Sequence, residues 1–305
     1  MMKRILNIIL SMLIGGAAYG QQLPQLTQYL FNAYSINPAV AGTGDDISIN
    51  SINRYQWEGI VDAPRTYTLS VQAPLKNDRS GIGTYLYTDI AGPTRRIGLQ
   101  GSYSYILPLK DNLKLSLALS AGMMQFAIDG HKIDLAEDND VAIQNSLGSR
   151  VLFDAKFGMY LYSDKFYFGL SLPQLAQNRL SVYEGITESQ SFLSNHFYAN
   201  IGYKFDVNDD ISLEPSSLVK YVSPAPVKID VNLKFEYQKK LWIAGGWRSS
   251  DAVNFMFGYN WNDNLVFGYG HDFTNTDLSE YSGSTHEILL GIKVSRKKKK
   301  TASNL

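Results

Sequence analysis

The stretch from Val227 to Tyr237 reads VKIDVNLKFEY, and it decides the fold class. Apolar residues alternate with Lys228, Asp230, Asn232, Lys234 and Glu236, so that one face is apolar and the other polar. The same alternation runs through 113–123, 151–161 and 253–261. With weaker cases it predicts about fourteen strands. They lie near 46–57, 65–73, 82–88, 96–106, 113–123, 151–162, 165–172, 195–205, 211–222, 227–237, 240–247, 252–261, 265–272 and 286–294. The chain is therefore predicted to be all-β.

Strand and loop lengths favour a transmembrane antiparallel β-barrel of the outer-membrane type over 46–295. Many strands reach the roughly 9–11 residues that a tilted strand needs to cross a bilayer. If the N-terminal side is periplasmic, every long connection falls at the external end, including 124–150 and 174–194. Short periplasmic turns with longer external loops are typical of bacterial barrels. A soluble β-sandwich is the alternative, because it can show the same alternation.

Aromatic residues support the barrel. Seven rings lie near the periplasmic ends of downward strands, as in an interfacial girdle. They are Tyr103, Tyr105, Tyr203, Phe205, Tyr237, Tyr259 and Trp261.

Composition narrows the function classes. The 305 residues carry no formal net charge at pH 7, so no basic field favours nucleic acid, and none is expected as a partner. The absence of cysteine excludes disulfide scaffolds and thiolate metal sites. No segment is apolar over the roughly 20 residues that a transmembrane helix needs.

The two ends of the chain have signals of their own. Residues 1–20 combine Lys3 and Arg4, an apolar stretch and small residues, which predicts a signal peptide cleaved near Gly20. Residues 296–305 form a basic tail, expected in the periplasm, whose charge run extends from Arg296 to Lys300. This tail is either a solvated end or a docking site for an acidic partner or lipid headgroups.

A search for chemistry predicts no catalytic, cofactor-binding or metal-binding residue, and hence no enzyme. The four histidines share no metal-ligand spacing. His286 near Ser282 and Ser284, and His196 near Ser194, lack an orienting acid that would make them base and nucleophile. The acidic loop 129–140 lacks the order of an EF-hand, which favours a solvated loop over a calcium site.

The segment 21–45 does not alternate, and with the start of the first strand it carries the most specific signal. It holds Tyr-x-Phe-Asn and Asn-Pro-Ala-x-x-Gly, followed by Arg-x-Gln-Trp and Ala-Pro. These elements are Tyr29, Phe31, Asn32, Asn37, Pro38, Ala39, Gly42, Arg54, Gln56, Trp57, Ala63 and Pro64. In this order they resemble the PorP/SprF family of type IX secretion system membrane proteins.

The resemblance implies an outer-membrane barrel of the Bacteroidetes type that works with the type IX secretion and gliding machinery. Similar proteins hold secreted adhesins at the cell surface or link to periplasmic partners that grip peptidoglycan. Cargo would then bind at the outer loops 124–150 and 174–194, while the segment 21–45 would be a periplasmic plug, a strap or a partner-docking motif. A general or selective porin is the alternative, because the inner face is polar and the sequence leaves open whether the lumen is filled.

Overall fold

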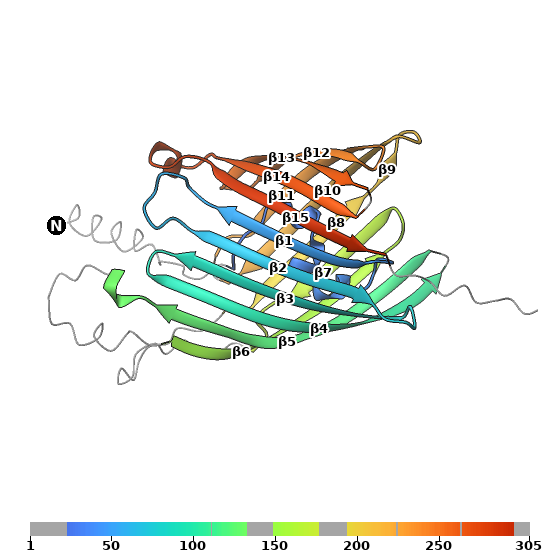
Figure 1. Cartoon of the computed structure of the whole chain (residues 1–305), viewed down its shortest axis with the longest axis horizontal. Helices are drawn as coiled ribbons and strands as arrows, with labels where there is room; N and C mark the ends of the chain where they lie inside the picture. The colour runs from blue at the N-terminus through green and yellow to red at the C-terminus, as the bar shows by residue number, and fades with distance from the viewer. Residues whose placement is uncertain are drawn as a thin grey trace, which may run out of the picture.

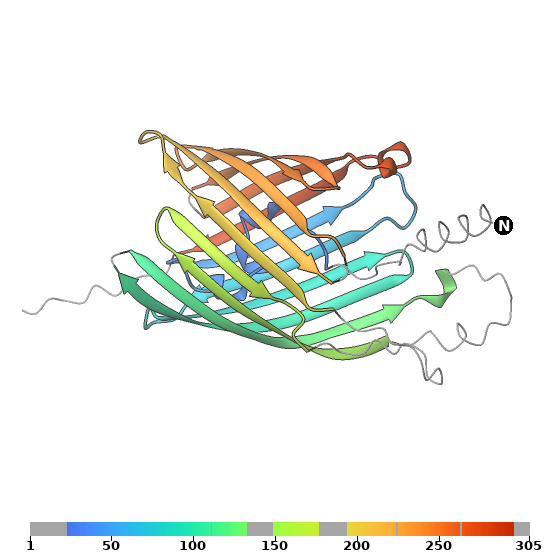
Figure 2. The same ribbon diagram turned by 180° about the vertical axis from the view of Figure 1, so that it is seen from behind.

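The alternating segments form strands that pair edge to edge in one closed antiparallel sheet (Figure 1 and Figure 2). This computed structural model describes residues 23–110, 112–132, 149–176, 194–223, 225–262 and 264–295. Of its 15 labelled strands, β8 and β9 both pair with β10 as one broken strand, so the wall has 14 positions. The predicted outer-membrane-type barrel of about fourteen strands is confirmed. The predicted signal peptide and basic tail lie outside the described residues.

The strands follow chain order around the barrel. Their bounds are β1 Ile47–Tyr55, β2 Arg65–Pro74, β3 Ser80–Ala91, β4 Thr94–Lys110, β5 Leu113–Ile128, β6 Ser149–Tyr162, β7 Phe166–Leu172, β8 His196–Tyr203, β9 Phe205–Asp206, β10 Ile211–Val222, β11 Lys228–Tyr237, β12 Leu241–Arg248, β13 Ala252–Trp261, β14 Leu265–Thr274 and β15 Thr285–Val294. The first and last strands pair from Ile47 with Val294 to Tyr55 with His286, and this ladder closes the ring. Closure gives each described strand position of the wall a neighbour on both sides, and a sheet in lipid requires such pairing.

The two faces of the wall have opposite chemistry. In β11, Val231 and Leu233 are 48% and 52% exposed on the outside, whereas Asp230 and Asn232 are buried inside. Large apolar side chains are exposed on the other strands as well, including all seven rings expected in the girdle. A soluble sandwich would bury these side chains, so the exterior is the face that meets lipid.

Connection length distinguishes the two ends of the barrel. One end, called here the outer end, carries the connections 56–64, 129–148, 173–195 and 275–284. The opposite, inner end carries only short turns, such as 75–79 and 163–165. Among the described residues, no helix is long and apolar enough to cross a membrane.

The wall is taller on one side than the periodicity predicts. Strands β4 and β5 have 17 and 16 residues, and the connection between β3 and β4 shrinks to Gly92 and Pro93. The predicted strand 195–205 is interrupted at Lys204, whose N–H donates to the carbonyl of Lys165 at 2.7 Å.

Residues 23–46 lie inside the barrel and form three short 3-10 turns, η1 Gln28–Leu30, η2 Ala33–Ser35 and η3 Pro38–Val40 (Figure 1). The last turn begins at Pro38 because the Asn37 side chain accepts the Ala39 N–H at 2.9 Å and proline suits a first helical position. Residues 21–45 were expected on the periplasmic side. In the structure, Leu23 lies beside Val222 and Pro226 at the outer end. The segment then runs through the lumen to β1 at the inner end.

Candidate functional site

The candidate site is the luminal segment, residues 23–46, together with the wall that it contacts. Its first half, Leu26 to Phe31, is held by charged side chains. The backbone N–H groups of Thr27 and Gln28 donate to the two oxygens of the Glu287 carboxylate at 2.9 and 2.6 Å. The Thr27 hydroxyl donates to Asp272 at 2.9 Å. These hydrogen bonds to the carboxylates of Asp272 and Glu287 fix the segment against β14 and β15.

Arg54, from the Arg-x-Gln-Trp motif, joins these groups. Its guanidinium lies 2.8 Å from Asp272 and 3.0 Å from Glu287, and it also donates to the Thr27 hydroxyl at 2.8 Å. All four residues are at most 2% exposed. Buried charges are tolerated only where they are paired and hydrogen-bonded. Arg54 therefore compensates the charges of Asp272 and Glu287. It also links both carboxylates to the segment through the Thr27 hydroxyl.

A second arginine extends the charge cluster to β11 and β12. Arg248 lies 3.2 Å from both Asp230 and Asp272 and donates to the Thr27 hydroxyl at 3.2 Å. Lys220 lies 3.0 Å from Asp230. The positive and negative side chains of the lumen thus pair with one another, and Thr27 of the segment belongs to the same network.

Two aromatic residues of the Tyr-x-Phe-Asn motif sit beside this cluster. The Tyr29 hydroxyl accepts a hydrogen bond from the Asn232 amide at 2.8 Å. Phe31 stacks on Trp242 with ring centroids 3.7 Å apart, and the Lys234 ammonium lies 5.7 Å from the Phe31 ring. Both rings therefore act as packing anchors against β11 and β12.

The second half, Asn32 to Gly42, is held by neutral groups. The Asn37 amide donates to the carbonyls of Met159 and Leu170 at 2.9 and 3.2 Å. The hydroxyls of Tyr34 and Ser102 share a hydrogen bond of 2.9 Å. No ion pair involves this half in the part of the chain that the structure describes.

Glycines in the wall make room for this half. A β-carbon at Gly83 would overlap the Tyr34 ring, and one at Gly158 would overlap the Asn37 side chain. At the inner end, Gly42 has a φ of +71° and packs against Gly81 so closely that a β-carbon on Gly42 would overlap its Cα. Any larger side chain at these positions would displace the segment.

The remaining motif residues lie at the outer rim. The Gln56 N–H donates to the Pro64 carbonyl at 3.0 Å, and the Trp57 N–H donates to the Thr285 hydroxyl at 3.2 Å. Ala63 lines the same rim loop, and Trp57 has a φ of 52°, in the left-handed region. The structure therefore divides the motif between the lumen and the rim. Tyr29, Phe31, Asn32, Asn37, Pro38, Ala39, Gly42 and Arg54 belong to the lumen.

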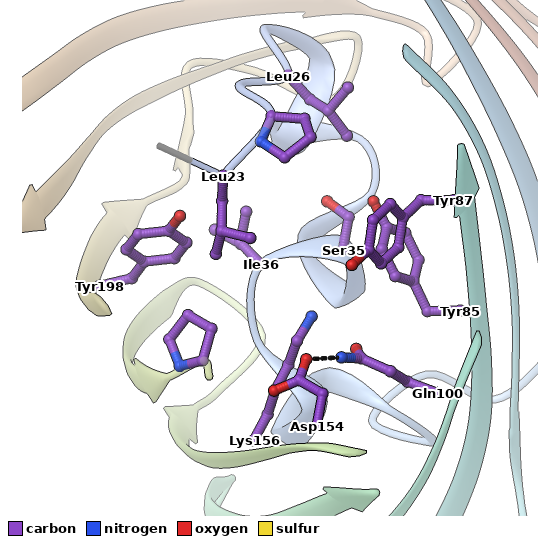
Figure 3. Close-up of a pocket in the computed structure, with 12 residues that line it drawn as sticks. Leu23, Leu26, Ser35, Ile36, Tyr85, Tyr87, Gln100, Asp154, Lys156 and Tyr198 are labelled. Atoms are coloured by element: carbon purple, nitrogen blue, oxygen red, sulfur yellow. Dashed lines mark hydrogen bonds between the residues drawn. The ribbon is translucent and has the colours of Figure 1, made fainter. Parts of the chain in front are cut away.

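A small cavity lies between the segment and the wall. A cavity of about 50 Å³ lies beside Leu23, Ile36 and Tyr198 (Figure 3). Figure 3 shows Tyr85 and Tyr87 on one side of it, with Gln100 hydrogen-bonded to Asp154 below, next to Lys156. The cavity holds a few water molecules at most, which excludes a wide pathway at this point.

The suggested base and nucleophile pairs do not form. The His196 Nδ1 contacts the Ser194 carbonyl oxygen at 2.9 Å, and the Ser282 hydroxyl donates to the Leu278 carbonyl. His286 bonds to Tyr269 and Glu58. The described residues contain no group of three or more histidine and acidic side chains that could hold a metal. Apart from Asp129, the acidic residues of the loop 129–140 lie outside the described residues.

The motif did not reveal the wall residues that bind the segment, namely Asp272, Glu287, Arg248 and Trp242. Each lies on the inward face of a strand, where period-two alternation could have placed it. An acidic residue on the inward face of a strand could have indicated that Asp272 and Glu287 have a role in the lumen. The sequence could not show which residue pairs with each acid, because that depends on which strands are neighbours in the closed barrel.

Comparison with known proteins identifies a family for this chain. The family profile "Type IX secretion system membrane protein PorP/SprF" matches residues 18–292. No curated protein matches the chain. Solved barrels with similar folds include the Ralstonia pickettii toluene transporter TbuX, at 9% identity and a TM-score of 0.49, covering 86% of this chain and 93% of that one. The Acinetobacter baumannii outer membrane protein Omp33 has 11% identity and a TM-score of 0.47, covering 84% and 100%. The closed barrel and the family match place this protein in the outer membrane.

Proposed function

Because the chain belongs to the PorP/SprF family of type IX secretion system membrane proteins, we propose that it is a non-enzymatic anchor. It binds secreted surface proteins of the adhesin type at the outer end of the barrel and holds them at the outer membrane. A contribution to gliding and a link to a periplasmic, peptidoglycan-associated protein belong to the same proposal.

The segment held inside the lumen is the observation that carries this proposal. Eight motif residues are used to fix the segment 23–46 inside the barrel, where it contacts β2, β4, β6, β11, β14 and β15. A general porin needs an aqueous path, whereas a platform for a partner needs a rigid barrel with accessible loops. The arrangement therefore supports anchoring over passive transport.

The outer end offers the partner surface. The connections 129–148 and 173–195 begin and end there, and the barrel mouth adds apolar Leu23 and Pro226 beside Lys228. An apolar centre with a charged rim is the usual composition of a protein interface.

Replacing residues 177–190 by a glycine and serine linker of equal length tests the proposal in the native bacterium. We expect the bound surface protein to be lost from the cell surface and from pull-downs, while the barrel still reaches the outer membrane. The matched control replaces 207–210 at the inner end and should retain the partner. Unchanged retention in the first variant would contradict the proposed binding surface.

A further inference from the structure

The outer wall carries two hollows that the luminal segment does not use. The first is a rim pocket of about 380 Å³ under the loop 56–64, and it is lined by Tyr55, Gln56, Trp57, Glu58, Arg65 and His286 among others. The second is a groove of about 410 Å³ on β13, β14 and β15, between Phe257, Tyr259, Phe267, Tyr269, Ile288 and Leu290. Both lie on the face of the barrel that meets the membrane.

The two hollows follow one another down the same strand. His286, Ile288 and Leu290 occupy successive outward positions on β15, about 7 Å apart for each pair of residues. Tyr269 joins the hollows, because its hydroxyl hydrogen-bonds to His286 Nδ1 at 2.6 Å while its ring lines the groove. A ligand that fills both must be polar at the rim and apolar toward the membrane centre.

The rim pocket offers one cation to an anionic group. Arg65 is exposed and makes no ion pair with another described residue. Glu58 also lines the pocket, but its carboxylate lies 3.2 Å from His286 Nε2. Arginine binds phosphate in a bidentate manner, and the amide of Gln56 with the rings of Tyr55 and Trp57 adds polar and stacking contacts. Arg65 is therefore the cation available to a phosphate.

The groove favours a lipid headgroup over free phosphate as the source of the phosphate group. Its lining side chains are apolar or aromatic, and Phe257, Phe267 and Leu290 are each exposed by nearly half. An acyl chain fits such a groove, and in the bilayer it gains from close packing against these side chains, because lipid tails are as apolar as the groove itself. Free phosphate would use the rim pocket alone.

We propose that the rim pocket and the groove form one binding site for a phosphorylated lipid of the outer leaflet. The phosphate lies at Arg65, and one acyl chain lies between Phe267 and Leu290. Gln56 and Trp57 then position the headgroup, which gives these two motif residues a role outside the lumen.

Native mass spectrometry of the detergent-purified protein tests the site, with phosphorylated lipid A as the probe. We expect the retained lipid to fall at least fivefold in Arg65→Ala. The matched control is Arg95→Ala, because Arg95 is exposed on the same rim two strands away and does not line the pocket. An equal loss in both variants would show general attraction to a charged rim and overturn the proposal.

A second pair of variants tests the groove without altering charge. Leu290→Trp should fill the groove and lower lipid retention, whereas Leu86→Trp, on the exposed outer face of β3, should not. Heat-modifiable migration on gels confirms that both variants remain folded. Full competition by inorganic phosphate, or undiminished retention in Leu290→Trp, would show that the acyl chain is not bound there and would overturn the proposal.

Discussion

The two halves of the luminal segment are held by different kinds of interaction. Leu26 to Phe31 meets Arg54, Arg248, Asp272 and Glu287, all buried and all charged. Asn32 to Gly42 meets backbone carbonyls, serine hydroxyls and glycines. The charged half depends on mutual compensation, so losing one partner leaves the others buried without their full complement of opposite charge. The neutral half depends on shape, so its contacts fail one at a time.

The two kinds of interaction act at different ends of the segment. Charge fixes the segment near the outer end, where a partner could approach it, and close packing fixes it near the inner end. Substitutions that remove charge should therefore have larger effects than those that remove fit or a single hydrogen bond.

The largest effect is expected from Arg54→Ala. Removing this cation leaves Asp272 and Glu287 without their shared partner, which should lower the free energy of unfolding by about 3–5 kcal/mol. Denaturant unfolding in detergent measures the loss. Arg54→Ala combined with Glu287→Gln should be less destabilised than Arg54→Ala alone, because one uncompensated carboxylate is removed. Equal or greater loss in the double variant would argue against charge compensation.

Gly158→Val should have the next largest effect. Its side chain would overlap Asn37 and Ala39 and force the neutral half from the wall, at a cost of about 1–3 kcal/mol. The chain has no cysteine, so maleimide labelling of a cysteine placed at Ser35 reports the displacement. Gly101→Val is the control, because no atom lies within 4 Å of a β-carbon there. Equal labelling in the two valine variants would refute the close fit.

Asn37→Ala removes one side chain that makes two wall hydrogen bonds and the cap of η3. We expect a loss of about 1–2 kcal/mol, because the two buried carbonyls lose a donor. Thermal unfolding followed by circular dichroism gives the value. A loss as large as that of Arg54→Ala would remove the distinction between the two halves.

The smallest effect is expected from Phe31→Leu. The variant keeps apolar volume but removes the stack on Trp242, which is worth about 0.5–1.5 kcal/mol. Phe255→Leu, which changes a ring exposed on the outer wall, serves as its control in the same unfolding measurement. A greater loss in the control would show that the Phe31 stack contributes nothing specific.

The sequence predicted the wall well, because period-two alternation is a local property. Every predicted strand overlaps an observed one, and the apolar side chains of β11 point outward as expected. It did not predict the extra height of β4 and β5, since the ends of a strand depend on its neighbours in the sheet.

The interior was less predictable. The motif identified which residues of the segment matter, but neither Asp272 nor Glu287 is near Thr27 in sequence, and their contact requires closure of the ring through β15 and β1. Nothing in residues 21–45 indicates that Leu23 lies at the outer end.

Planar-bilayer conductance tests the central claim most directly, namely that the segment 23–46 fills the lumen. The purified protein should give no large, steady ion current, and a variant that lacks residues 23–42 should give one. Large, steady currents from the unaltered protein, equal to those of the shortened variant, would contradict the claim and favour a porin.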